Sequence, residues 1–136
     1  MQRILVVDDT ELNCELLKEI LRDGYIVEMA RDGEEALLRL REYPPGGVSA
    51  MFLDLQMPKM DGFSVMAQMK REGLMARIPV LIISSEHSVE VENQCFEMGA
   101  SDFIHKPFEG SIVKNRVKNA IELFSCKNQL EWEVKE

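Results

Sequence analysis

Five short runs of apolar residues alternate along this chain with longer segments whose apolar residues recur at helical spacing. The runs are apolar throughout rather than at every second position, which is typical of strands buried on both faces of a parallel sheet. Parallel neighbours need crossover connections, and helices commonly supply them. The sequence therefore predicts an α/β protein with a doubly wound, five-stranded parallel sheet flanked by five helices. The predicted strands are residues 4–7, 25–30, 50–53, 79–83 and 102–104.

The order of these strands within the sheet follows from general connection rules. Right-handed crossovers, together with a reversal beside the first strand of the direction in which strands are added to the sheet, favour the order 2-1-3-4-5. In sheets of this kind, ligands bind at the carboxyl ends of the strands, next to the reversal point. We therefore expect the functional residues in the loops that follow the strands.

Size, charge and cysteine content exclude several classes of protein. The 136 residues suit one domain, and a net charge of −8 argues against direct binding to nucleic acid. No apolar stretch approaches the roughly 20 residues of a membrane span, and no signal peptide precedes the first strand. The three cysteines are odd in number and widely spaced, which suits neither a disulfide framework nor a zinc site. We expect a cytoplasmic protein that is not membrane-bound.

Polar residues follow four of the predicted strands: Asp8, Asp9, Asp54, Ser84 and Lys106. Three carboxylates at one sheet edge repel one another unless a cation neutralises them, and Mg²⁺ prefers such oxygen ligands. A carboxylate that faces both Mg²⁺ and an ammonium group is suited to attack phosphorus. Taken singly, these residues have structural explanations: a helix N-cap for the Asp pair, a loop hydroxyl for Ser84 and a solvated charge for Lys106.

Four motifs carry a resemblance to a known family. Val6–Asp9, Leu53–Gly62, Ile83–Ser85 and Lys106–Phe108 resemble the conserved segments of response regulator receiver domains, and the resemblance covers roughly residues 3 to 124. It implies a flavodoxin-like receiver fold and a part in two-component signalling.

The resemblance implies a role for each site residue. Asp54 would be the phosphoacceptor, and Asp9 and Asp54 would bind Mg²⁺ together with the backbone carbonyl of Gln56. Asp8 would assist through a metal-bound water, while Lys106 would contact the phosphoryl group. Such a domain modifies itself and is not a turnover enzyme.

The resemblance also implies a switch that reports the phosphoryl group. Ser84 would donate to a phosphoryl oxygen, and Phe103 would turn inward when Ser84 moves. The peptide bond between Lys106 and Pro107 is usually cis in the family. Gln56 and Glu86 occupy positions that often tune how fast the phosphate is lost.

The implied partners are a histidine kinase or phosphotransfer protein and a downstream output. The surface of the fourth helix, fifth strand and fifth helix would report the phosphorylated state, either to that output or through a homodimer. His87 and His105 lack a suitably spaced partner in the sequence, so no role is assigned to them.

The C-terminal segment extends the expected domain. We assign residues 1–124 to the receiver and residues 125–136 to a helical extension, a linker to an output domain beyond this chain. An imperfect heptad pattern favours a parallel dimer through this helix, and a solvated tail is the alternative. The segment from residue 115 to 131 is similar to connectors that precede cyclic-dinucleotide output domains. The heptad residues are Val113, Ala120, Leu123, Lys127, Leu130 and Val134.

Two other functions compete with a phosphorylation switch. Magnesium-dependent phosphohydrolases also pass through aspartyl phosphates, but they usually carry an acidic residue two positions after the nucleophile, where this chain has Gln56. A phosphate-independent binding module could keep the fold without the chemistry. The complete set of polar residues argues against that second alternative: Asp8, Asp9, Asp54, Ser84 and Lys106.

Overall fold

A computed structural model describes the backbone of residues 1–135 and the side chains of residues 1–127. Its single sheet has the order β2-β1-β3-β4-β5 with every neighbouring pair parallel, which confirms the predicted fold. The elements are β1 (Gln2–Val7), α1 (Glu11–Leu21), β2 (Tyr25–Ala30), α2 (Gly33–Glu42), β3 (Ala50–Asp54), α3 (Gly62–Arg71), β4 (Val80–Ser84), α4 (Val89–Glu97), β5 (Asp102–His105) and α5 (Gly110–Lys135).

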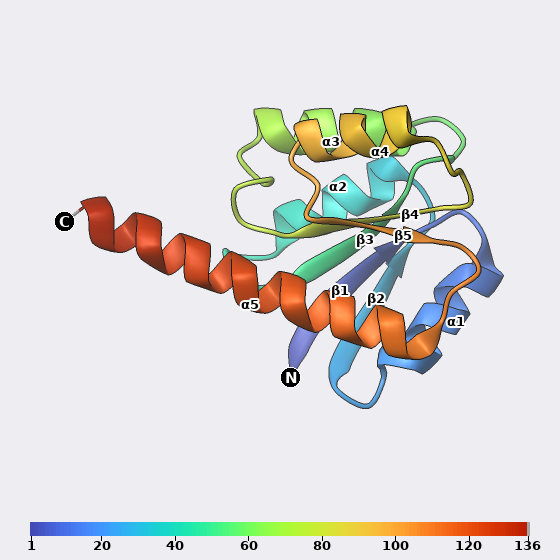
Figure 1. Ribbon diagram of the computed structural model, residues 1–136, viewed down its shortest axis with the longest axis horizontal. Helices are drawn as coiled ribbons and strands as arrows, with labels where there is room; N and C mark the ends of the chain where they lie inside the picture. Colours follow the sequence, from blue (N-terminus) through green and yellow to red (C-terminus); the bar gives the residue numbers. More distant parts are fainter. Residues whose placement is uncertain (136) are drawn as a thin grey trace.

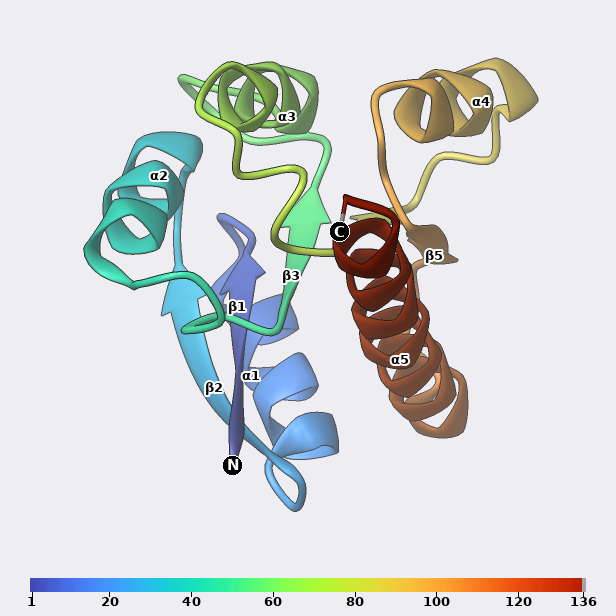
Figure 2. The ribbon, with the colours of Figure 1, turned by 90° about the vertical axis from the view of Figure 1, so that its left-hand side faces the viewer.

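The sheet is covered by helices on both faces. Figures 1 and 2 show α2, α3 and α4 on one face and α1 and α5 on the other. Successive side chains of a strand point to opposite faces, so each strand feeds both layers. In β1, Leu5 and Val7 belong to the core under α2 and α3, whereas Ile4 and Val6 belong to the core under α1 and α5. This double burial is the reason that the strands are apolar at consecutive positions.

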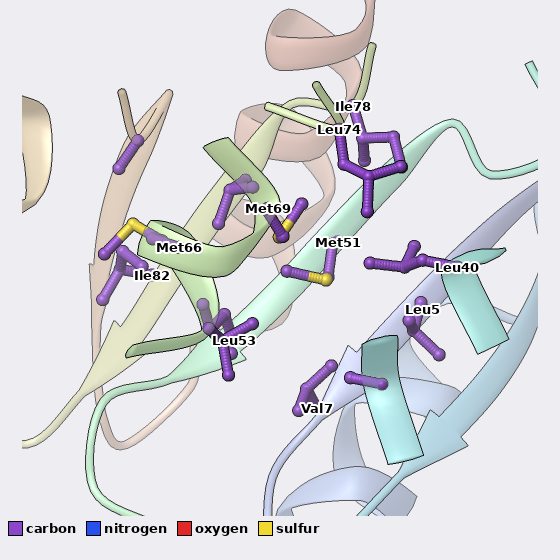
Figure 3. Close-up of a cluster of buried hydrophobic side chains, with 14 of the residues drawn as sticks. Leu5, Val7, Leu40, Met51, Leu53, Met66, Met69, Leu74, Ile78 and Ile82 are labelled. Carbon is purple, nitrogen blue, oxygen red and sulfur yellow. The ribbon is translucent and has the colours of Figure 1, made fainter. Parts of the chain in front are cut away.

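Methionines fill much of the core on the α2–α3–α4 face. Met51 of β3 and Met66 and Met69 of α3 are fully buried and lie between the sheet and its covering helices (Figure 3). An unbranched thioether adapts to irregular gaps between larger aliphatic groups. The helix after the third strand is thereby packed closely onto the strand that ends at Asp54.

Gly62, the first residue of α3, leaves no room for a side chain. A Cβ atom there would lie 2.7 Å from the backbone oxygen of Asp54 and 2.9 Å from the Cα of Leu55. Its amide donates to the Leu55 carbonyl at 3.0 Å, which holds the helix start against the end of β3. The spacing between α3 and the sheet at the functional edge therefore depends on this glycine.

Gly62→Ala is expected to destabilise the protein by about 1 to 3 kcal/mol, because overpacking against backbone atoms forces the helix away from β3. Urea unfolding would measure the loss. Gly24→Ala is the matched control, since a Cβ at Gly24 meets nothing within 4 Å. Equal stability of the two variants would show that α3 can shift without cost.

Helix α5 is longer than the domain needs. It runs unbroken for 26 residues and projects beyond the sheet (Figure 1). Val113 and Ala120, the first members of the predicted heptad seam, are buried in the domain's own core, so these two positions are not available to a partner helix. Leu123 is 71% exposed, and the Leu130 and Val134 side chains lie outside the described residues. Any seam would therefore begin beyond Ala120.

Over the part of the chain that the structure describes, no helix has the length and apolar character needed to cross a membrane.

Candidate functional site

Three carboxylates meet at the carboxyl edge of the sheet. Asp8 and Asp9 follow β1, and Asp54 is the last residue of the neighbouring strand β3. The parallel register pairs Val7 with Leu53, which brings the next residue of each strand to the same level. One oxygen from each carboxylate lies within 4.8 Å of the other two. Three hard oxygen donors at this spacing fit a divalent cation such as Mg²⁺.

Asp8 is held rigidly and is fully buried. Its Oδ1 accepts from the Thr10 amide at 2.9 Å, and its Oδ2 accepts from Asn13 Nδ2 at 3.1 Å. Burial of a charged carboxylate requires such partners. The Asn13 contact was not predicted from the sequence. Its only signal is that Asn13 stands four residues before the buried Leu17, on the inward side of α1.

Lys106 approaches the carboxylates from the edge strand β5, at the same carboxyl edge of the sheet. It follows β5, and its Nζ lies 3.3 Å from Asp8 Oδ2 and 3.5 Å from Asp54 Oδ1. Its side chain is only 19% exposed. The structure therefore excludes the solvated surface charge that was the alternative for this residue. The Lys106–Pro107 peptide bond is cis, as expected.

The carboxyl group of Asp54 is the electrostatically perturbed member of the cluster. Burial, reinforced by the negative charge of Asp8, raises its pKa from 3.8 to about 6. The ammonium of Lys106 and the Gln56 amide, which donates to Asp54 Oδ1 at 3.3 Å, act in the opposite direction. A raised pKa means that the ionised group destabilises the metal-free fold, so a cation that binds there stabilises it.

Replacing Asp54 by Asn is expected to stabilise the metal-free protein at pH 8. A carboxyl group whose pKa rises on folding stabilises the fold while the pH is below the pKa that it has in the unfolded chain, here 3.8. That stabilisation is lost as the pH rises through the pKa of the folded protein, about 6. Asn stays neutral throughout, so the variant should gain about 1 to 3 kcal/mol at pH 8. Thermal unfolding in chelator would measure the difference. A gain of the same size at pH 4.5 would contradict this electrostatic origin.

Ser84 ends the strand next to the one that carries Asp54, and Gln56 lines a cavity beside Asp9. Ser84 ends β4, is 2% exposed, and its Oγ accepts from the Glu86 amide at 3.0 Å. The cavity has a volume of about 420 Å³ and is lined by residues that include Asp9, Gln56 and Glu86. It offers a space beside Asp9 that is open to solvent and is lined by both polar and apolar side chains. A phosphoryl group and a hydrated cation are ligands of matching chemistry.

The aromatic residue of the expected switch is already inside the protein. Phe103 of β5 is 4% exposed and belongs to the core on the α4 side. The inward position that we expected to follow phosphorylation is thus the one the structure has. Phe103 packs well among apolar neighbours, which is sufficient to stabilise this position.

The comparisons with known proteins agree with this geometry. Residues 4–118 match the family described as the response regulator receiver domain. The chain belongs to the response regulator receiver family. Receiver domains are regulatory domains of two-component signalling, and they typically bind Mg²⁺ at an acidic pocket like the Asp cluster of this chain.

The chain is also similar to parts of longer proteins. It is 34% identical to a Vibrio cholerae protein named "Probable cyclic di-GMP phosphodiesterase" over 96% of this chain and 31% of that protein. It is 38% identical to the alkaline phosphatase synthesis transcriptional regulatory protein PhoP of Bacillus subtilis over 86% of this chain and 47% of that protein. The chain thus spans less than half the length of either relative.

A solved receiver structure shares the fold. The chemotaxis protein CheY4 of Vibrio cholerae superposes with a TM-score of 0.79 at 28% identity, over 88% of this chain and 98% of that chain.

Proposed function

We propose that this receiver takes a phosphoryl group from the phosphohistidine of a histidine kinase or phosphotransfer protein onto Asp54, and that the change controls a downstream output. The observation that carries the proposal is the position of Lys106, whose Nζ lies between two buried carboxylates. An ammonium group in this position can neutralise a phosphoryl oxygen next to Asp54.

The same residues fit the cation that phosphoryl transfer needs. Asp9, Asp54 and the backbone carbonyl of Gln56 would hold Mg²⁺, with Asp8 contacting a bound water. When bound, Mg²⁺ supplies positive charge that stabilises the oxygens of the transferring group. The exposed position of Asp9 favours exchange of the ion with solvent.

The residues of this chain divide the chemistry among them. An oxygen of Asp54 attacks phosphorus while the bond from phosphorus to the donor imidazole nitrogen breaks, and the donor leaves as a neutral histidine after protonation. Lys106 pairs with a phosphoryl oxygen as charge develops on it. Ser84 accepts from the Glu86 amide, which leaves its own hydrogen to donate to a second phosphoryl oxygen.

The surface made by α4, β5 and α5 would report the modification. Val89 and Phe96 of α4 and Ile112 of α5 are large apolar residues exposed at 68%, 44% and 45%. Exposed apolar groups on both helices support contact with an output domain or a second receiver. Phe103 and Ser84 connect this surface to the phosphorylation site.

The relatives support an output domain that follows α5 in a longer protein. One relative is named as a cyclic di-GMP phosphodiesterase and another as a transcriptional regulator, so the receiver could control either class. We expect it to act in the cytoplasm, and the free thiols of Cys14, Cys95 and Cys126 suit a reducing compartment.

Intact-mass spectrometry after incubation with acetyl phosphate tests the proposed function. A Mg²⁺-dependent, hydroxylamine-labile adduct of about 80 Da, one phosphoryl group on a carboxylate, is the expected result. Absence of an adduct with both acetyl phosphate and a phosphohistidine donor would favour the phosphate-independent binding module instead. Steady hydrolysis of a phosphomonoester would favour the phosphohydrolase.

A further inference from the structure

The two histidines of this chain, which were assigned no role from the sequence, stack on each other beside the site. His87 lies in the loop between β4 and α4, and His105 is the last residue of β5. Their ring centroids are 4.5 Å apart and the ring planes differ by 13°. Residues 18 positions apart in sequence thus make a face-to-face contact at the protein surface.

His105 makes a second contact with the same loop. Its Nδ1 lies 3.1 Å from the Glu86 carbonyl oxygen, so an Nδ1–H donates to that oxygen. Its Nε2 lies 3.6 Å from Glu92 Oε2 of α4, and its ring is 5.1 Å from that of Phe103. The strand β5 is therefore tied to residues 86 and 87 of the loop through one side chain.

This loop carries the groups that would sense a phosphoryl group. The Glu86 amide donates to Ser84 Oγ at 3.0 Å, and the Lys106 amide donates to the Ser84 carbonyl at 2.9 Å. His105 adjoins Lys106 in the chain and contacts Glu86 across the loop. It thus links the two backbone segments that present the Ser84 hydroxyl and the Lys106 ammonium group.

We propose that His87 and His105 are positioning residues, which clamp the β4–α4 loop against β5 in the arrangement that lets Ser84 reach a phosphoryl group on Asp54. The proposal rests on the proposed function and assigns these residues no direct contact with the reacting atoms.

Binding of beryllofluoride, a phosphoryl mimic, in the presence of Mg²⁺ tests the positioning role. At pH 7.5, His87→Ala should weaken binding about three- to tenfold, the range that one ring–ring contact is worth. His87→Phe keeps a ring for stacking and should restore wild-type affinity. Leu38→Ala, a change at an exposed apolar residue of α2, is the matched control and should bind as wild type.

Rescue by the conservative variant separates positioning from a merely structural effect. A His87→Ala variant that binds as wild type, or a His87→Phe variant that binds as weakly as His87→Ala, would overturn the proposal.

The rate of amide hydrogen exchange at Glu86 in the metal-free protein tests the clamp independently of the proposed function. Faster exchange in His87→Ala and recovery in His87→Phe are expected, because the Glu86 amide belongs to the clamped turn. If wild type does not bind beryllofluoride, the proposed function fails, and this exchange difference still decides whether the clamp exists. Unchanged exchange overturns the clamp in either case.

Discussion

Asp54→Asn is expected to carry no phosphoryl group under conditions in which the wild-type chain is modified by acetyl phosphate and Mg²⁺. The amide is a poor nucleophile, and it removes one of the three carboxylates that lie within 4.8 Å of one another. It nearly matches the carboxyl group in size, and the neutral form suits a buried site. Loss of the adduct therefore would not reflect unfolding. Intact mass before and after hydroxylamine would measure it.

Asp61→Asn is the matched control for that experiment. Asp61 lies on the same loop but caps α3 by accepting from the Ser64 amide at 2.9 Å, and Asn can accept the same bond. It should be modified like wild type. An adduct on Asp54→Asn that disappears from Asp61→Asn would reassign the acceptor to Asp61.

Lys106→Met is expected to slow phosphorylation by acetyl phosphate about 100-fold or more, the usual cost of removing one preorganised charge from a transferring group. Met keeps a similar apolar stem and removes the ammonium that lies 3.5 Å from Asp54 Oδ1. The same charge opposes the rise in the Asp54 pKa, so its loss should raise that pKa above about 6. Rates measured by intact mass between pH 6 and 9 would report both effects.

Lys118→Met on the exposed side of α5 is the control for charge loss in general. It should react at the wild-type rate. A Lys106→Met rate within a few-fold of wild type would mean that the ammonium group does not contact the transferring phosphoryl. The carboxylates and the cation alone would then account for the chemistry.

The fold was predictable because strands buried on both faces of the sheet are apolar at consecutive positions. Each inner strand must satisfy two cores, so residues such as Val6 and Val7 are both apolar. The start of β1 was less visible, because it pairs with β2 from Gln2 onward through backbone bonds that need no apolar side chain. The ends of strands are therefore predicted less accurately from sequence than their centres.

The candidate site was predictable to the extent that topology determines it. Parallel strands in a known order bring Asp8 and Asp54 to one edge whatever their side chains do. The Asn13 contact and the His87–His105 stack depend instead on rotamers and on the path of a loop. Spacing along the chain carries no information about such contacts, which is why the histidines lacked a partner in the sequence. The inward position of Phe103 depends on packing in the same way.

The length of α5 converts small movements into large ones. Its 26 residues span about 39 Å at 1.5 Å per residue, and its N-terminal half packs on the sheet while the rest projects outward. A tilt of about 5° at the packed half would displace the far end of such a rod by roughly 3 Å. A lever of this kind needs no large rearrangement inside the domain. It would let a sub-ångström adjustment near β5 become a displacement of roughly 3 Å at the far end of the helix.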